Sequence, residues 1–194
     1  MKVIIVGGGG TIGRAIRAAL PKDWSAIIAS RSGDVSVDLN DPASISAMYE
    51  QSGPVDGVIC VAGGAKFGPL NVLSDADFEA GFRNKLMGQA NLIRLGQDHL
   101  SLGASVTLTS GMLATHPNPN SVALTTFNIA VEGFVRAAAL NLEHGHRLNV
   151  VRTPMVRETA RKMGWGDGGM PAAKVAQLYL SSLLGEQTGA VITP

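Results

Sequence analysis

The sequence predicts an α/β fold in which a doubly wound parallel sheet is covered by helices on both faces, forming one three-layer domain over residues 1–194. Three observations predict it. Short runs of β-branched residues alternate with longer amphipathic segments, the pattern of strands joined by crossover helices. Glycines directly follow the first apolar run, and no linker or repeat interrupts the pattern. With 45% hydrophobic and 16% charged residues, the 194-residue chain can bury one large core.

The chain opens with a strand, a glycine loop and a helix. Residues 3–6, Val-Ile-Ile-Val, are expected as a buried strand, and residues 11–20 as a helix that Pro21 ends. The loop between them satisfies two glycine patterns of dinucleotide-binding folds. In such loops one glycine makes a tight turn, another lets the backbone approach a pyrophosphate, and the last lets helix and strand pack closely. The start of the helix offers free N–H groups and the positive end of its dipole to an anion.

We therefore expect a Rossmann-like fold that binds a dinucleotide. The alternative, a flexible loop of consecutive glycines, does not account for the strand before the glycines and the helix after them. The candidate phosphate-binding residues are Gly7, Gly8, Gly10, Thr11, Ile12 and Gly13.

The rest of the chain continues the alternation of strands and helices. Asp41 followed by Pro42 starts one helix, and Ser74 precedes another whose first turns are acidic. Only residues 30–34 separate the second expected strand from the third, which is too few for a helix. The expected strands beyond the first are residues 24–29, 35–37, 55–61, 104–109, 147–152 and 190–193, and the expected further helices are residues 41–49, 75–100, 122–143 and 172–184.

Composition narrows the classes of partner. The formal net charge of +1, without a basic run interleaved with aromatic residues, disfavours nucleic acid. Cys60 is the only cysteine, so an intramolecular disulfide cannot form, a cysteine-ligated zinc site is disfavoured, and a reducing cytoplasm is the expected compartment. No apolar run approaches the ~20 residues that span a bilayer. We expect a soluble protein with a small-molecule ligand and neither a metal site nor a membrane partner.

Further motifs follow one another along nearly the whole chain. They are Asp38 after the third expected strand, Cys60-Val61-Ala62-Gly63 at a second glycine turn, Asn84 within a long helix, Ser110 at a strand end, Ala130-Val131-Glu132-Gly133 in the next helix, and residues 148–154 ending at Pro154. Together with the glycine loop, this series resembles the short-chain dehydrogenase/reductase superfamily, whose members are oxidoreductases with a nicotinamide cofactor. Both asparagines of the family's Asn-Asn-Ala-Gly turn are replaced here.

The resemblance implies a role for each motif. Asp38 matches the acid that meets the adenine, and the motifs at Ala62, Gly63 and Pro154 match positions that line the cofactor. Ser110 matches the catalytic serine, and Asn84 the asparagine in the middle of a helix beside the site. Judged without the resemblance, a serine at a strand end also serves as a cap, and an asparagine in a helix also bonds locally.

The resemblance breaks at the reaction centre. Members of the family carry Tyr-x-x-x-Lys just before the Ala-Val-Glu-Gly segment, where this chain has Leu124 and Asn128. In the family the tyrosine exchanges a proton with the substrate, while the lysine lowers its pKa and binds the nicotinamide ribose. Loss of a positioned general acid costs ~10²–10⁴ in rate, whereas juxtaposing hydride donor and carbonyl keeps an entropic advantage. Asn128 can still donate its amide to the ribose hydroxyls, and His116 is either a substitute proton donor or an exposed loop histidine.

The residues after the second expected strand indicate which cofactor binds. NAD-specific folds place an acid about 20 residues beyond the glycines, but this chain has Ser30, Arg31 and Ser32 there. A guanidinium flanked by hydroxyls suits a 2′-phosphate, so the sequence favours NADP over NAD. The alternative is a surface arginine that serves solubility. The family's helix between the second and third strands is missing, so we expect a more open adenine side.

Residues 155–170 resemble the family's substrate-binding loop, and their methionines and Trp165 supply an apolar lining. The alternative is a loop that packs only on the protein's own surface.

We also expect a homodimer or a tetramer, because in the family two long helices pair across a two-fold axis. The resulting hypothesis is an NADP(H)-binding reductase of a small carbonyl or alcohol with a degenerate site. The alternative is a non-catalytic NADP(H) sensor; a scaffold without nucleotide does not explain the intact glycine turn.

Overall fold

The computed structural model describes all residues, 1–194, and contains one six-stranded parallel sheet in the order β2-β1-β3-β4-β5-β6. The strands are β1 (Lys2–Val6), β2 (Ser25–Ala29), β3 (Val55–Cys60), β4 (Leu100–Gly111), β5 (Arg147–Thr153) and β6 (Val191–Ile192). The α-helices are α1 (Thr11–Ala19), α2 (Pro42–Ser52), α3 (Asp75–Gly81), α4 (Gly88–Arg94), α5 (Val122–Ala138), α6 (Arg157–Lys162) and α7 (Ala172–Leu184). The predicted fold class, a doubly wound α/β sheet in three layers, is confirmed.

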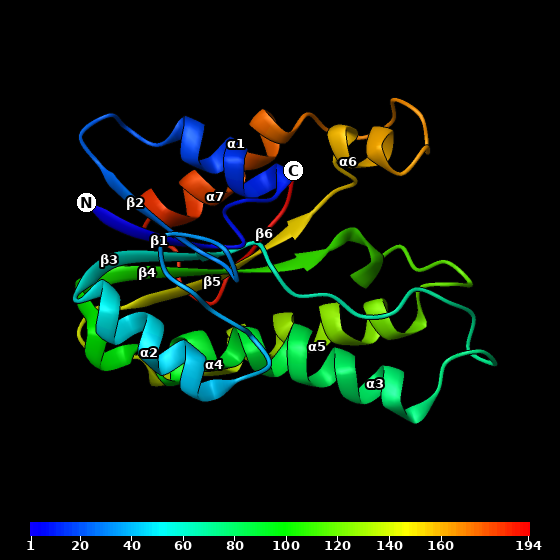
Figure 1. The fold of residues 1–194 in the computed structure, drawn as a ribbon, viewed down its shortest axis with the longest axis horizontal. Helices are drawn as coiled ribbons and strands as arrows, with labels where there is room; N and C mark the ends of the chain where they lie inside the picture. Colours follow the sequence, from blue (N-terminus) through cyan, green and yellow to red (C-terminus); the bar gives the residue numbers. More distant parts are fainter.

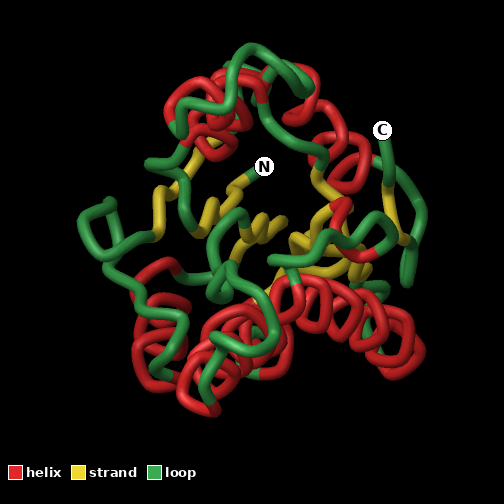
Figure 2. The backbone as a smooth tube through the Cα atoms, turned by 90° about the vertical axis from the view of Figure 1, so that its right-hand side faces the viewer, coloured by secondary structure: helices red, strands yellow, loops and turns green.

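Helices cover both faces of the sheet. Figure 1 shows α1 and α7 on one face and α2, α4 and α5 on the other, and Figure 2 shows the strands enclosed between the two helical layers. Alternate residues of β1 serve the two faces: Ile4 and Val6 belong to the core against α2, α4 and α5, whereas Val3 and Ile5 belong to the core against α1 and α7. Because both faces are buried, the central strands are continuous apolar runs rather than alternating ones.

One expected strand does not form. Residues 35–37 contribute only an isolated parallel bridge between Ala29 and Val35, so the prediction of a third strand there is wrong. A parallel pair needs a crossover of about a dozen residues, which the short connection cannot supply. Instead the connection is a tight turn, in which the Asp34 carboxylate accepts a hydrogen bond from the Ile28 N–H at 2.9 Å.

The helix expected over residues 75–100 is interrupted. A π-helical segment, Phe82–Met87, lies between α3 and α4, and β4 already begins at Leu100. Glycines bound this segment and permit close packing: a Cβ on Gly81 would lie 2.4 Å from the Phe127 ring, and one on Gly88 would lie 2.7 Å from Leu39. π-Helical turns occur frequently at functional sites. The helix expected over residues 122–143 likewise ends earlier, at Ala138.

Helix α5 is apolar over an unusual length. With its short extension to Asn141 it is long and apolar enough to cross a membrane by length and composition alone, a test that core helices of soluble proteins also pass. In this fold α5 packs on β4, β5 and α3.

Candidate cofactor and active site

The glycine loop joins β1 to α1 at the carboxyl edge of the sheet. Gly7 has φ of +82°, a conformation that favours glycine, and a Cβ on Gly13 would lie only 2.4 Å from the Cα of Gly8. Gly10 precedes α1 without a side-chain cap, and the N–H groups of Gly9, Thr11 and Ile12 donate to no acceptor in the protein. The loop therefore presents unsatisfied backbone donors at a helix start, which is what a pyrophosphate requires.

A cavity of about 370 Å³ lies beside this loop, at the ends of β1, β2 and β3. It brings together residues that the sequence analysis proposed separately. Of the predicted cofactor residues, the cavity is lined by Gly7, Arg31, Asp38, Ala62 and Gly63, and Asn84 also lines it. Ser30 is part of the wall, whereas Ser32 lies outside it, with its N–H directed at the Ser30 hydroxyl at 3.3 Å.

Charges of both signs face this cavity. Asp38 accepts hydrogen bonds from the backbone N–H of Asn40 at 2.9 Å and from its side-chain amide at 2.8 Å. These bonds, helped by the nearby Arg31, lower the pKa of Asp38 below its usual value. Arg31 is exposed and forms no ion pair, so its guanidinium is available to a ligand.

Asn84 ties two loops together at the cavity wall. Its Oδ1 accepts a hydrogen bond from the Gly64 N–H at 2.9 Å, and its Nδ2 donates to the Asn40 side chain at 3.2 Å. Asn84 belongs to the π-helical segment, and its carbonyl oxygen would lie 3.3 Å from a Cβ on Gly63, where φ is +97°. In this structure Asn84 thus fixes the loop after β3 against the loop after β2.

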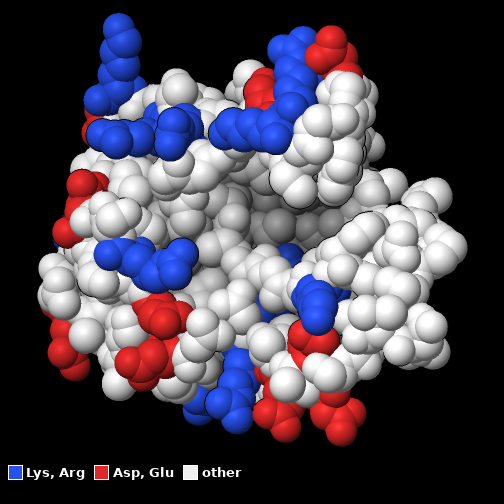
Figure 3. All heavy atoms as spheres, turned by 45° about the vertical axis from the view of Figure 1, so that its right-hand side comes forward, with Lys and Arg blue, Asp and Glu red and all other residues white.

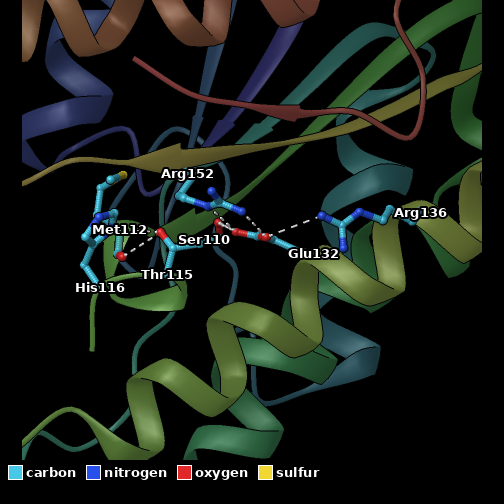
Figure 4. A network of polar contacts seen from close by, with 7 residues as sticks. All are labelled: Ser110, Met112, Thr115, His116, Glu132, Arg136 and Arg152. Atoms are coloured by element: carbon cyan, nitrogen blue, oxygen red, sulfur yellow. Dashed lines mark hydrogen bonds and ion pairs between the residues drawn. The ribbon is translucent and has the colours of Figure 1, made fainter. Parts of the chain in front are cut away.

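Ser110 belongs to a buried ion network (Figure 4). Its hydroxyl donates to the Glu132 carboxylate at 2.7 Å, and Arg152 binds the same carboxylate through Nε at 2.9 Å and a terminal nitrogen at 2.7 Å. Ser110 and Arg152 are register partners on β4 and β5, and Glu132 reaches them from α5. Burial acts to raise the pKa of Glu132, but the bonds from Arg152 and Ser110 outweigh it and lower the pKa.

The Ser110 hydroxyl, at the position that matches the family's catalytic serine, is therefore engaged inside the protein. Ser110 is only 2% exposed. The neighbouring residue, Gly111, is the one that borders Asn128: a Cβ on Gly111 would lie 3.2 Å from the Asn128 amide nitrogen. His116 is exposed, and its ring meets the Thr115 hydroxyl at 3.0 Å.

The two positions that depart from the family pattern lie on α5. Leu124 is half-buried and brings no titratable group. Asn128 is buried, and its side-chain amide forms no hydrogen bond within the protein. The adjacent hydroxyls of Thr125 and Thr126 donate to backbone carbonyls, at 3.0 and 2.9 Å respectively. The amide of Asn128 is thus the polar group of this helix turn that remains free for a ligand.

Three charged residues of this region were missed as site residues by the sequence analysis: Lys85, Glu132 and Arg152. Lys85 is 5% exposed and donates from Nζ to the Thr109 carbonyl at 2.8 Å. The spacing of Lys85, Gln89 and Leu92, which recurs on one helical face, was the signal that could have identified Lys85 as buried. Arg152 directly follows the apolar pair Val150 and Val151 in β5, which was the corresponding signal there.

The segment from Pro154 to Met170 folds back on itself beside the glycine loop. Val156 and Met170 form a parallel bridge, and the Met170 N–H donates to the Met155 carbonyl at 2.8 Å. Lys162, at the end of α6, reaches across to the Thr11 hydroxyl at 3.1 Å. Figure 3 shows a hollow between the two helical layers at this edge, with Lys and Arg atoms within it and along its rim.

The side chains predicted to line this segment have mixed positions. The side chains of Met155, Met163 and Trp165 are about half exposed, at 47%, 56% and 56%, whereas Met170 is partly buried and packs on the core beneath α7. The segment therefore presents apolar groups to solvent.

The strand order and the glycine loop define a Rossmann-like α/β fold, and the comparisons define its family. A family model described as enoyl-(acyl carrier protein) reductase matches residues 12–188. The structure of the protein lin1944 from Listeria innocua is 37% identical, with a TM-score of 0.94 over 100% of this chain and 98% of that one. The chain belongs to the short-chain dehydrogenase/reductase family.

Two further structures are similar along the whole chain. A small-chain dehydrogenase is 25% identical, with a TM-score of 0.87 over 100% of this chain and 96% of that one. A small-chain dehydrogenase in complex with NADPH has the same fold at 24% identity, with a TM-score of 0.87 and the same coverage. A search of curated proteins found no match.

Proposed function

We propose that this protein binds NADP(H) at the carboxyl edge of its sheet and acts as a reductase of a small carbonyl compound. The observation that carries the proposal is the cavity of about 370 Å³ that extends from the glycine loop to Arg31 and Asn84. Ligands of open α/β sheets bind in the crevice outside the carboxyl ends of the strands. That a dehydrogenase of the same fold was solved with NADPH supports the choice of ligand class.

The residues present fit this cofactor. The close contact between Gly13 and Gly8 leaves no room for side chains, so that the unsatisfied N–H groups of Gly9, Thr11 and Ile12 can meet the pyrophosphate. Arg31, flanked by Ser30 and Ser32, would take the 2′-phosphate that distinguishes NADP from NAD. Asp38 would meet the adenine.

Bound NADPH supplies a hydride to the substrate carbonyl. Ala62 and Gly63 line the same cavity as Arg31 and Asp38 and would contact the adenosine half. Pro154 would border the nicotinamide, and the free amide of Asn128 would bind the hydroxyls of the nicotinamide ribose. Neither Leu124 nor the engaged Ser110 hydroxyl offers a proton to the substrate oxygen, so water would supply the proton that accompanies the hydride. The rate would then depend on holding hydride donor and carbonyl together. We therefore expect turnover well below that of relatives with Tyr-x-x-x-Lys, by the ~10²–10⁴ that a positioned general acid contributes.

The same departures support a second candidate, an NADP(H) sensor without turnover. Its specific support is the Ser110–Glu132–Arg152 network. In this network Ser110, which occupies the position of the family's catalytic serine, donates its hydroxyl to the carboxylate of the Glu132–Arg152 ion pair. The two candidates share the cofactor site and differ in chemistry. Oxidation of NADPH in the presence of a panel of small aldehydes and ketones separates them, because a sensor leaves the absorbance at the reduced-cofactor band unchanged with every compound.

Calorimetric titration with NADPH and NADH tests the proposal directly. We expect NADPH to bind more tightly than NADH. We also expect Arg31→Ala to weaken the binding of NADPH about tenfold and to leave the affinity for NADH unchanged. Arg17→Ala, which removes an exposed arginine in the last turn of α1, is the matched control. Absence of binding of either nucleotide to the wild-type protein would overturn the proposed function.

We also propose a homodimer formed through α5. Along this helix the residues Thr126, Ile129, Gly133 and Ala137 are exposed and lie on one face, and Ile129 is 51% exposed. Gly133 has no neighbouring atom within 4 Å of an added Cβ, so the face allows close approach of a second helix. Ile129→Asp should yield a monomer in light scattering, whereas Leu102→Asp, at a site 84% exposed outside this face, should not. A monomeric wild-type mass would contradict the proposal.

A further inference from the structure

Lys85 is a buried cation without an anionic partner. Its side chain is 5% exposed, and its only hydrogen bond is from Nζ to the Thr109 carbonyl at 2.8 Å. No carboxylate lies within ion-pair distance of it. An ammonium can donate three hydrogen bonds, and burial of an ion without a counter-charge is unfavourable. Burial accordingly lowers the pKa of Lys85 to about 8.

The backbone groups at this end of β4 are hydrogen-bonded without the Lys85 ammonium. Gln89, one helical turn further on, already donates from its side-chain amide to the Thr109 carbonyl at 3.0 Å. The same amide group accepts from the Thr109 N–H at 2.7 Å. A neutral side chain therefore satisfies both backbone groups of Thr109, and the charge at position 85 remains unexplained by the architecture.

Lys85 directly follows Asn84, which lines the cofactor cavity, and its own buried side chain lies behind the lining residues. Its Cα would lie 3.5 Å from a Cβ on Gly63, in the turn that borders the cavity. The π-helical segment that carries Lys85 packs on α5, which carries Asn128. Lys85 reaches Thr109 and Asn128 borders Gly111, two residues further along β4. At ~3.3 Å per residue, these anchor points lie within ~7 Å of each other along the strand.

We propose that Lys85 is a cofactor-binding residue whose ammonium, together with the amide of Asn128, binds the hydroxyls of the nicotinamide ribose. The cation that relatives carry on α5 is thus supplied from the π-helical segment, and a neutral amide takes its place on α5. This inference rests on the proposed function. It explains both the free amide of Asn128 and the two unused N–H donors of Lys85.

The test compares two ligands that differ only in the relevant half of the cofactor. NADPH carries the nicotinamide ribose, whereas adenosine 2′,5′-bisphosphate carries only the adenosine half. We expect Lys85→Met to weaken NADPH at least tenfold in calorimetry, as loss of a charge-assisted hydrogen bond does, and to leave the bisphosphate unchanged. Gln89→Met is the matched control, because it removes the other donor to Thr109 on the same helical face. It should leave the affinity ratio of the two ligands unchanged.

Each outcome decides one hypothesis. Suppose that the wild-type protein binds both ligands. If Lys85→Met then changes the affinity for neither ligand, or changes both affinities equally, the role of Lys85 is refuted while the cofactor site stands. If wild-type protein binds neither, the proposed function itself fails. Should Lys85→Met not fold, NMR of the lysine ε-CH₂ groups in the wild-type protein gives the answer: NADPH must shift the Lys85 resonance and the bisphosphate must not, and equal shifts would refute the role.

Discussion

At the β1–β2 end of the crevice, backbone groups prepare the site: the glycine loop leaves N–H donors free and Arg31 stands unpaired at the cavity wall. At the β4–β5 end, side chains are engaged with one another: Ser110 and Arg152 donate to the Glu132 carboxylate, and the exposed Arg136 lies 3.9 Å from it. The first region is open to a ligand at little cost, because its donors have no internal partner to give up. The second region can accept a ligand only through the groups left over, Asn128 and Lys85.

This difference separates binding from chemistry within one fold. Phosphate recognition by a glycine loop depends on backbone geometry, which tolerates change in distant side chains. Proton transfer depends on particular titratable side chains, and replacing them with Leu124 and Asn128 removes that function without disturbing the loop. The most informative experiments are therefore those that damage one region and measure the other.

The largest effect is expected in the glycine loop. A Cβ on Gly13 would lie 2.4 Å from the Gly8 Cα and 2.6 Å from the Gly7 carbonyl, so Gly13→Ala must displace backbone that forms the phosphate site. We expect NADPH affinity to fall by about a hundredfold, with destabilisation of about 1–3 kcal/mol from overpacking. Gly168→Ala is the matched control, since Gly168 lies outside the glycine loop and nothing lies within 4 Å of its added Cβ. Equal affinities of the two variants in calorimetry would show that the loop is not the anion site.

The next largest effect is expected in the Ser110–Glu132–Arg152 network. Glu132→Gln leaves the largely buried Arg152 guanidinium without its carboxylate, and we expect a loss of about 3 kcal/mol of unfolding free energy in urea denaturation. The surface pair of Glu79 and Arg83, 3.8 Å apart, provides the control: Glu79→Gln should cost less than about 1 kcal/mol. If the binding of NADPH to folded Glu132→Gln is unchanged, the two regions are energetically independent. Because the pKa of Glu132 is lowered, its contribution to stability should be lost as the pH falls below the ordinary glutamate value of 4.5.

Sequence reasoning predicted the fold well because burial on both faces leaves a strong pattern. The apolar runs at β1 and β3 and the face of α7 follow from hydrophobicity alone, and α7 has the predicted bounds. It failed at residues 35–37 and at the π-helical segment. Whether residues 35–37 form a strand depends on the length of the crossover. The π-helical segment depends on tertiary contacts of its flanking glycines with Phe127 and Leu39, which leave no local pattern in the sequence.

The site was predictable in its backbone half and less so in its side-chain half. Gly7, Arg31 and Asp38 meet at one cavity because a parallel sheet brings its loops to one edge. The partner of the Ser110 hydroxyl was not predictable, because Glu132 and Arg152 come from separate elements and their pairing depends on the register of β4 with β5. Lys85 was overlooked because a lysine in a helix is ordinarily assigned to solvent.

A smaller effect is expected from the pH dependence of the Lys85 region. Since the pKa of Lys85 is lowered to about 8 from 10.5, the unfolded chain binds more protons between these values, and stability should rise with pH there relative to Lys85→Met. NADPH affinity should fall over the same range as the ammonium loses its proton. The comparison is made in a Cys60→Ala background, because burial raises the pKa of Cys60 to about 11 and Lys85 itself acts on that pKa. Tyr179, whose pKa burial raises to about 12, is present in both proteins and cancels. Parallel pH profiles of wild type and variant would contradict the assignment.

The smallest effect is expected where the two regions meet the segment after β5. Lys162 donates to the Thr11 hydroxyl at 3.1 Å from an exposed position, so its charge lies beside the unsatisfied donors of the glycine loop. A pyrophosphate bound there would attract it, but solvent screens an exposed charge, and we expect Lys162→Ala to weaken NADPH only about two- to fivefold. The effect should shrink as salt rises to 0.5 M, because screening shortens the range of the interaction. Lys22→Ala, which removes an exposed lysine beyond the opposite end of α1, should leave the NADPH affinity unchanged.

The same contact predicts an effect on proteolysis within Met155–Met170. Bound NADPH should slow cleavage more in wild type than in Lys162→Ala, since the lysine links this segment to the occupied loop. Equal protection in both proteins would mean that the segment does not respond to the cofactor.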